Sequence, residues 1–124
     1  MSDSRNLTFT PEEVEDGKVM AILAWILFLI PLFAARDKRF AMFHTEQAIA
    51  LWAVTIILYI VVTIITVILG QVSDTLACVV SILSVVVWLF YLVMWIMGLL
   101  SAIQGKAKAL PIIGQFGAKL NLVK

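Results

Sequence analysis

The stretch from Ala48 to Gly70, AIALWAVTIILYIVVTIITVILG, decides the fold class of this chain. It contains 23 residues and no acidic or basic side chain. As a helix it is about 34 Å long, enough to cross a hydrocarbon core of about 30 Å. A soluble domain of 124 residues cannot hide so much apolar surface, because small chains bury a smaller share of theirs. We therefore predict that residues 48–70 span a membrane.

The composition of the whole chain agrees with this prediction. Hydrophobic residues make up 63% of the sequence and charged residues 14%, against roughly 45–50% and roughly 25% in soluble domains. Between residues 40 and 105 the only acidic or basic side chains are His44, Glu46 and Asp74. This pattern excludes a soluble enzyme, a disordered tail and a nucleic-acid-binding domain.

Net charge, cysteine content and motifs exclude further classes. The formal net charge of +1 provides no general attraction to polyanions, so we expect no nucleic-acid partner. Cys78 is the only cysteine, which excludes an internal disulfide or thiolate cluster, and we expect it to be an inert apolar residue. We predict no enzyme, cofactor or metal site, because nucleophile elbows, phosphate-binding loops, paired catalytic carboxylates and metal motifs are missing.

Two further apolar runs complete the predicted fold, an all-α integral membrane protein with three transmembrane helices in one domain. Residues 19–35 make only about 25 Å of helix, the short limit for a span, and Pro31 can kink it. A tilted or partly re-entrant first segment therefore stays open. Residues 76–103 exceed the hydrocarbon core and should tilt or project. The short polar loop 71–75 makes the second and third helices antiparallel neighbours.

The polar segments around these spans have their own signals. In the acidic tail 1–18, Thr10-Pro11-Glu12-Glu13 predicts a capping box with a helix starting at Pro11. Residues 40–47 are amphipathic, and we expect them at the headgroup level. The basic tail 104–124 predicts a short interfacial helix from Pro111. Its apolar side would contain Ile112, Ile113, Phe116, Leu120 and Val123.

The basic residues predict an orientation. With three spans, the first loop and the C-terminus lie on one side, which holds most of the lysines and arginines. The positive-inside rule then places that side in the cytoplasm and the N-terminus outside, in a bacterial inner or an intracellular membrane. Five basic residues are candidates for contact with lipid headgroups: Arg36, Lys38, Arg39, Lys106 and Lys108.

The densest polar cluster near a span consists of His44, Glu46 and Gln47. His44 and Gln47 share a helical face with Leu51. Our favoured interpretation is that these side chains bond to neighbouring helices at the water boundary. The alternatives are a specific binding site, including a proton-sensitive switch, and a metal site, which one imidazole and one carboxylate do not complete.

A polar stripe runs along the second span, at Thr55, Tyr59, Thr63 and Thr66. Hydroxyl groups within lipid hold helices together modestly, so we favour packing over the alternative, which is the lining of a pore.

The third span contains two features with open alternatives. Its small-residue pairs, Ala77/Ser81 and Gly98/Ala102, permit close helix approach either within the chain or between chains. Its aromatic residues near the middle indicate a face buried against another helix or, alternatively, a flat pocket for a lipid, quinone or pigment. These aromatic residues are Trp88, Tyr91 and Trp95.

Several motifs together resemble a known family. They are Pro31-Leu32, an Arg-Asp turn at Arg36, an aromatic-x-x-Phe-His-x-x-Gln run over 40–47 and Leu-Pro-Ile-Ile at 110–113. The chain resembles small bacterial three-span proteins related to the chloroplast inner-envelope import component of the Tic translocon. Within that group it is similar to the MamF/MmsF-type magnetosome membrane proteins.

The resemblance implies limited functional information. The chloroplast relative belongs to a protein-conducting complex, and the magnetosome relatives influence mineral size and assemble into larger particles. The signature positions carried over are Phe43, His44 and Gln47, with no chemistry attached. Acidic residues commonly follow the Arg-Asp turn in the magnetosome type, whereas Lys38 and Arg39 follow it here, which counts against contact between this loop and iron or mineral.

We therefore expect a small membrane scaffold or accessory subunit that acts through helix–helix association. Its partners would be membrane lipid and either further copies of itself, as a homo-oligomer, or a larger membrane complex. The alternative is an oligomeric channel or a protein-import-like translocation component. In that case the threonine stripe would line the pathway, with His44 and Glu46 at its mouth.

Overall fold

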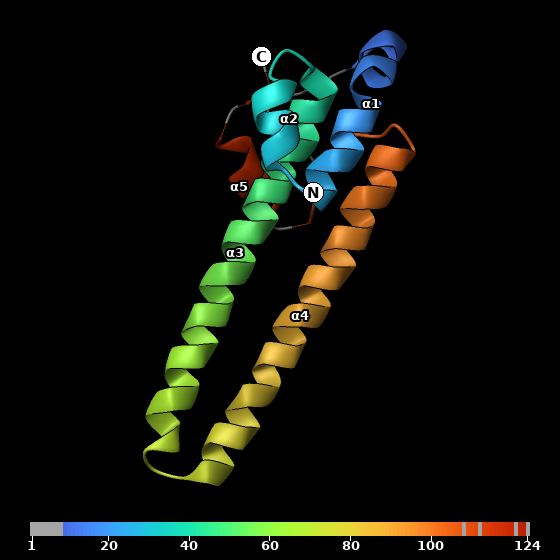
Figure 1. The fold of residues 1–124 in the computed structure, drawn as a ribbon. Coiled ribbons are helices and arrows are strands. Elements are labelled where there is room, and N and C mark those ends of the chain that lie inside the picture. Colours follow the sequence, from blue (N-terminus) through green and yellow to red (C-terminus); the bar gives the residue numbers. More distant parts are fainter. Residues whose placement is uncertain (1–8, 108, 112, 121, 124) are drawn as a thin grey trace.

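A computed structural model describes residues 9–107, 109–111, 113–120, 122 and 123 of the chain. These residues form helices and connecting segments, and no strand occurs among them. Two long helices make an antiparallel hairpin, and the shorter helices gather at one end of it (Figure 1). In chain order the helices are α1 (Pro11–Ile26), α2 (Leu29–Ala34), α3 (Arg39–Gly70), α4 (Asp74–Ile103) and α5 (Gly114–Ala118).

The hairpin of α3 and α4 matches the second and third predicted spans. Both helices are long and apolar enough to cross a membrane, and their most apolar stretches are not buried within the chain. They end at Gly70 and Ile103, where the uncharged runs of the sequence end. Ser73 caps the start of α4, since its side chain accepts a hydrogen bond from the Leu76 amide. Residues 71–73 form the turn, as the short polar loop predicted.

The first apolar run is not a third span, and the three-span prediction is wrong in this respect. Helix α1 ends at Ile26, Leu27 is extended, and the chain turns back as α2 (Figure 1). Pro31 explains the position of the break. A proline has no amide hydrogen and its ring clashes with the carbonyl four residues earlier, which here belongs to Leu27. Pro31 is tolerated in the first turn of α2, where amides lack intrahelical partners.

This turn places the start of α1 on the same side as the first loop, and we call the turned-back run of residues 11–34 the re-entrant segment. Two ion pairs join the regions, Glu13 to Arg39 at 2.7 Å and Asp16 to Lys38 at 2.9 Å. The prediction that the N-terminal segment lies across the membrane from the first loop is therefore wrong. The predicted capping box is present, because Glu13 N donates to the Thr10 hydroxyl and Thr10 N donates to the Glu13 carboxylate.

The parts of the chain at this end form what we call the headpiece. It comprises residues 9–51, residues 94–103 of α4 and the described residues after α4 (Figure 1). Residues 40–47 are buried on every side of the helix. Their position at the headgroup level stays a prediction. Helix α1 packs against this part of α3, and α5 with its flanking segments also packs against α3. The large apolar core residues here are Phe40, Met42, Phe43 and Leu51.

The C-terminal tail also differs from its prediction. An interfacial helix was expected from Pro111, but α5 covers only Gly114–Ala118. Ile113 and Val123 are buried, whereas Phe116 and Leu120 are each 44% exposed. Ile112 lies outside the described residues. The tail is therefore folded onto α3 as part of the headpiece, and its described apolar residues do not share one exposed face.

Candidate functional site

A buried run of polar residues in α3 is the centre of the headpiece. His44, Thr45, Glu46 and Gln47 follow one another in the sequence, and each is 0% exposed. Polar side chains removed from water are costly unless hydrogen bonds replace the lost hydration. The partners of these four residues therefore decide how the headpiece is assembled.

His44 joins α3 to two other parts of the chain. The indole Nε1 of Trp25, in α1, donates to Nδ1 of His44 at 2.9 Å. An indole nitrogen can only donate, so Nδ1 is the acceptor and the ring proton of a neutral imidazole lies on Nε2. That nitrogen is 2.9 Å from the carbonyl oxygen of Lys106, to which it donates. Both ring nitrogens are thus occupied, and the rings of Phe40 and Phe43 each pack edge to face with the imidazole.

Gln47 and Glu46 hold the C-terminal tail by its backbone. Oε1 of Gln47 accepts from the Leu110 amide at 3.0 Å, and its Nε2 donates to the Gly114 carbonyl at 3.2 Å. Oε2 of Glu46 accepts from the Leu122 amide at 3.2 Å. Together with the bond of His44 to the main chain of residue 106, these contacts form what we call the tail clamp. Thr45 takes no part, since its hydroxyl donates to the Ala41 carbonyl within α3.

Two glycines of α5 permit the close approach that the tail clamp requires. A Cβ atom on Gly117 would be 2.8 Å from both Nε2 of Gln47 and the backbone oxygen of Glu46. A Cβ atom on Gly114 would be 3.0 Å from Oε1 of Gln47 and 2.6 Å from the Cβ of Ala109. Sequence alone did not single out these glycines. Their spacing of three, on one helical face, is the signal that could have predicted a contact surface.

Trp25 also has a role that the sequence did not predict. Its ring lies over Gly98 of α4, where a Cβ atom would be 2.2 Å from the ring. Its carbonyl oxygen accepts a hydrogen bond of 2.6 Å from the indole of Trp95. Gly98 and Ala102 are both buried within the chain. This small-residue pair therefore packs α4 inside the headpiece.

The residues of the predicted polar stripe differ in their exposure. Thr55 and Thr66 are half-buried, whereas Tyr59 and Thr63 are exposed. The Thr66 hydroxyl donates to the Val62 carbonyl within its own helix. Ser81, of the other small-residue pair, is half-buried and donates to the Cys78 carbonyl.

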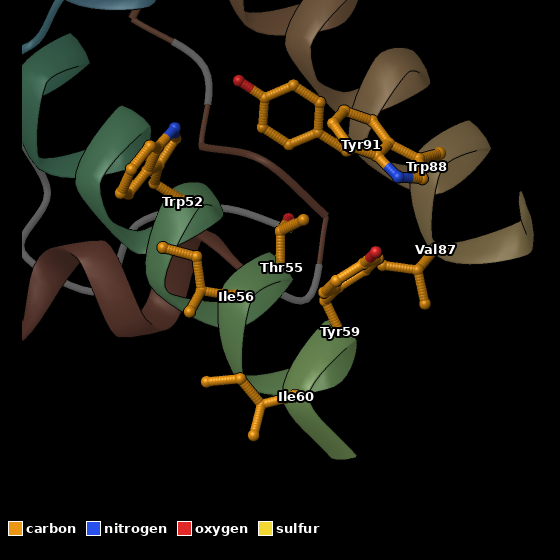
Figure 2. Close-up of a pocket in the computed structure, with 8 residues that line it drawn as sticks. All are labelled: Trp52, Thr55, Ile56, Tyr59, Ile60, Val87, Trp88 and Tyr91. Carbon is orange, nitrogen blue, oxygen red and sulfur yellow. The ribbon is translucent and has the colours of Figure 1, made fainter. Parts of the chain in front are cut away.

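The three residues of the predicted aromatic face also lie in two different places. Trp88 and Tyr91 line a groove between α3 and α4, with a volume of about 250 Å³ (Figure 2). Trp95 is not among the residues that line it, and its indole donates a hydrogen bond to α1. We call this space the aromatic groove. Its wall includes Trp52, Thr55, Tyr59, Val87, Trp88 and Tyr91.

Two of the basic residues assigned to lipid headgroups have partners in α1. The ion pair with Asp16 raises the pKa of Lys38 above its ordinary value. The pKa of Glu13 is lowered by the Thr10 amide and by Arg39, whose guanidinium also lies over the Phe9 ring. Arg36 and Lys106 are exposed. Lys108 lies outside the described residues.

Chemically, the arrangement holds chain segments together. The ring nitrogens of His44 and the amide of Gln47 are used in bonds to the indole and the backbone. Within the part of the chain that the structure describes, no three His, Cys, Asp or Glu side chains gather as a metal site.

Comparison with known proteins gives one match. The model of the MamF/MmsF family, described as the magnetosome magnetite crystal formation protein family, matches residues 16–117. Neither a curated protein nor a solved structure matches the chain. The matched range contains the re-entrant segment, the hairpin and the tail clamp up to Gly117. The resemblance to the Tic import component stays a prediction.

Proposed function

Because the chain belongs to the MamF/MmsF magnetosome magnetite crystal formation family, we propose that it serves this process as a small integral membrane scaffold or accessory subunit. The observation that carries the proposal is the tail clamp, which fastens residues 106–122 to the buried start of α3. A headpiece fixed in this way offers one constant surface at one membrane face. The hairpin of α3 and α4 would hold that surface in the membrane.

A role without catalysis fits the chemistry of the headpiece. Its buried histidine and glutamine are taken up by bonds between segments, so they are not available to a substrate. The hairpin supports association, because both helices carry large apolar side chains along their exposed faces. Such faces meet either lipid or the helices of another chain. We propose that a second copy or a larger membrane complex covers part of them.

We further propose that the headpiece lies in the cytoplasm of a bacterial cell. The described lysines and arginines are all in the headpiece, whereas residues 71–75 contain none. The positive-inside rule favours the cytoplasm for the basic side. Exposed Arg36, Lys106 and Lys119 would there attract anionic lipid headgroups, at about 1 kcal/mol per charge near the surface.

Thiol labelling of whole cells tests this orientation. In a Cys78→Ala background, Ser73→Cys places a thiol at the hairpin turn and Gln115→Cys places one on the exposed side of α5. An impermeant reagent should label the first variant in intact cells and the second only after the membrane is broken. The reverse pattern would contradict the proposed orientation, and labelling of both in intact cells would contradict a single orientation.

Native mass determination in nanodiscs tests the scaffold. We expect a defined homo-oligomer or a stoichiometric partner protein. Gln47→Leu, which removes both clamp bonds of its amide, should weaken that assembly while the hairpin stays helical. Gln115→Leu is the matched control, because Gln115 is exposed. A monomer with no co-purifying protein would refute the scaffold, and ion flux in liposomes that depends on Thr55 and Thr66 would favour a channel.

A further inference from the structure

We propose that the aromatic groove binds a flat, conjugated ring that carries a carbonyl group and an apolar chain, the chemistry of an isoprenoid quinone. The ligand would enter sideways from the lipid. Its ring would lie between α3 and α4, and a carbonyl oxygen would accept a hydrogen bond from the Thr55 hydroxyl. The proposal concerns binding alone and does not depend on the scaffold function.

The shape of the groove fits a single substituted ring. Two aromatic side chains come from each helix, Trp52 and Tyr59 from α3 and Trp88 and Tyr91 from α4 (Figure 2). The rings of Trp88 and Tyr91 meet edge to face, with centroids 6.1 Å apart. Trp52 and Trp88 are 49% and 60% exposed, so the groove is open towards the lipid. Aromatic walls of this kind favour stacked or edge-on contact with another flat ring.

The Thr55 hydroxyl indicates that the ligand has an acceptor. Among the described residues, Oγ1 of Thr55 is the one buried side-chain polar atom without a hydrogen-bond partner. Two other threonines of α3 behave differently, since Thr45 and Thr66 donate to the carbonyl four residues earlier at 2.7 and 2.8 Å. Figure 2 shows the Thr55 side chain pointing into the space between the helices. A buried donor left without a partner costs free energy. The accessible area of this oxygen is below 1 Å², so an incoming acceptor would recover that free energy once the Thr55 side chain turns its hydroxyl into the groove.

The depth of Thr55 in the membrane favours a ring carbonyl over the acyl chain of a phospholipid as the partner of its hydroxyl. Thr55 is seven residues after Ala48, the start of the uncharged run, or about 10 Å along the helix. An acyl chain at that depth is pure hydrocarbon and would leave the hydroxyl unpaired. A carbonyl on a ring buried in the leaflet would pair with it. Val87, which is 9% exposed, gives the groove an apolar wall for the ring edge.

The test uses the full chain in nanodiscs and decylubiquinone, a benzoquinone with a ten-carbon chain, as the probe. Quinones quench tryptophan fluorescence on contact, and the groove contains Trp52 and Trp88. We expect quenching that saturates as the mole fraction of quinone in the bilayer rises. The saturable part should disappear in the double variant Trp52→Phe, Trp88→Phe, because the remaining Trp25 and Trp95 lie outside the groove wall.

Substitutions at Thr55 test the hydrogen bond itself. Thr55→Val keeps the shape of the side chain and removes the donor, so half-saturation should need about tenfold more quinone, the effect of one ordinary hydrogen bond. Thr55→Ser keeps the donor and should bind as the natural chain does. Thr63→Val is the matched control, because Thr63 is an exposed threonine of the same helix outside the groove.

Three outcomes would overturn the proposal. Quenching that rises linearly without saturation would show simple partition of quinone into the bilayer. Equal half-saturation for Thr55→Val and the natural chain, with unchanged helicity, would show that the Thr55 hydroxyl makes no hydrogen bond to the quinone. Loss of the quenching when decylbenzene, which has the ring and chain but no carbonyl, is added at a mole fraction equal to that of the quinone would show a groove that accepts any apolar molecule.

Discussion

The indole of Trp25 donates a hydrogen bond of 2.9 Å to Nδ1 of His44, and this bond fixes the re-entrant segment against the first membrane helix. Because Nδ1 accepts, Nε2 must donate, and it does so to the carbonyl of Lys106 in the C-terminal tail. One imidazole therefore couples the two ends of the headpiece.

The first prediction concerns the bond itself. Trp25→Phe keeps an aromatic ring over Gly98 but leaves Nδ1 of His44 without its donor. Leaving a buried acceptor unpaired should lower the free energy of unfolding of the headpiece by about 1–3 kcal/mol. Chemical unfolding in bilayer discs, followed by the near-ultraviolet signal of the remaining aromatic residues, measures the change. Trp52→Phe, at an exposed tryptophan, is the control, and an equal loss in both variants would refute the role of the bond.

The second prediction concerns the tail clamp. Gly117→Ala places a methyl group 2.8 Å from the backbone oxygen of Glu46, so the tail must shift away from α3. We expect faster proteolysis of the tail while α3 and α4 stay intact. Gly70→Ala is the matched control, because its methyl group would meet Ala77 at 3.5 Å, an ordinary contact. Tail cleavage that is as slow in Gly117→Ala as in the control would refute this packing.

The sequence predicts the local features of this fold but not the contacts between residues far apart in the chain. The hairpin was predictable because the uncharged runs 48–70 and 76–103 are far longer than a soluble helix needs. The capping box at Thr10 was predictable because its two bonds join residues three apart. The first apolar run was at the length limit, where a single proline decides between a kinked span and a turn. Partners 63 and 67 residues from Gln47 have no local signal, so the tail clamp emerged only from the fold.

The third prediction is a pH dependence at the start of α1. The Thr10 amide and Arg39 lower the pKa of Glu13 below its ordinary value of 4.5. A lowered pKa in the folded state means that the ionised carboxylate stabilises folding. That contribution should be complete above about pH 4.5 and should be lost as the pH falls through the lowered value. Hydrogen exchange of the first turn of α1 measures the loss.

Substitution of two neighbouring carboxylates shows which of them causes this pH dependence. Glu13→Gln should remove the acid-dependent step in hydrogen exchange, because its amide cannot ionise. Glu12→Gln, at an exposed neighbour, should keep the step. An unchanged step in Glu13→Gln would assign the pH dependence to another group.

The fourth prediction separates packing within the chain from association between chains at Gly98. A Cβ atom at this position would lie 2.2 Å from the ring of Trp25, so Gly98→Ala must displace the ring or α1 as a whole. Overpacking of this kind costs about 1–3 kcal/mol. We expect a lower unfolding midpoint for the headpiece and weaker protection of the Trp25 indole from hydrogen exchange. The mass of the assembly should change only under conditions where the headpiece itself unfolds. A change in assembly mass with the headpiece fully folded would instead place Gly98 at an interface between chains, contrary to its burial under Trp25.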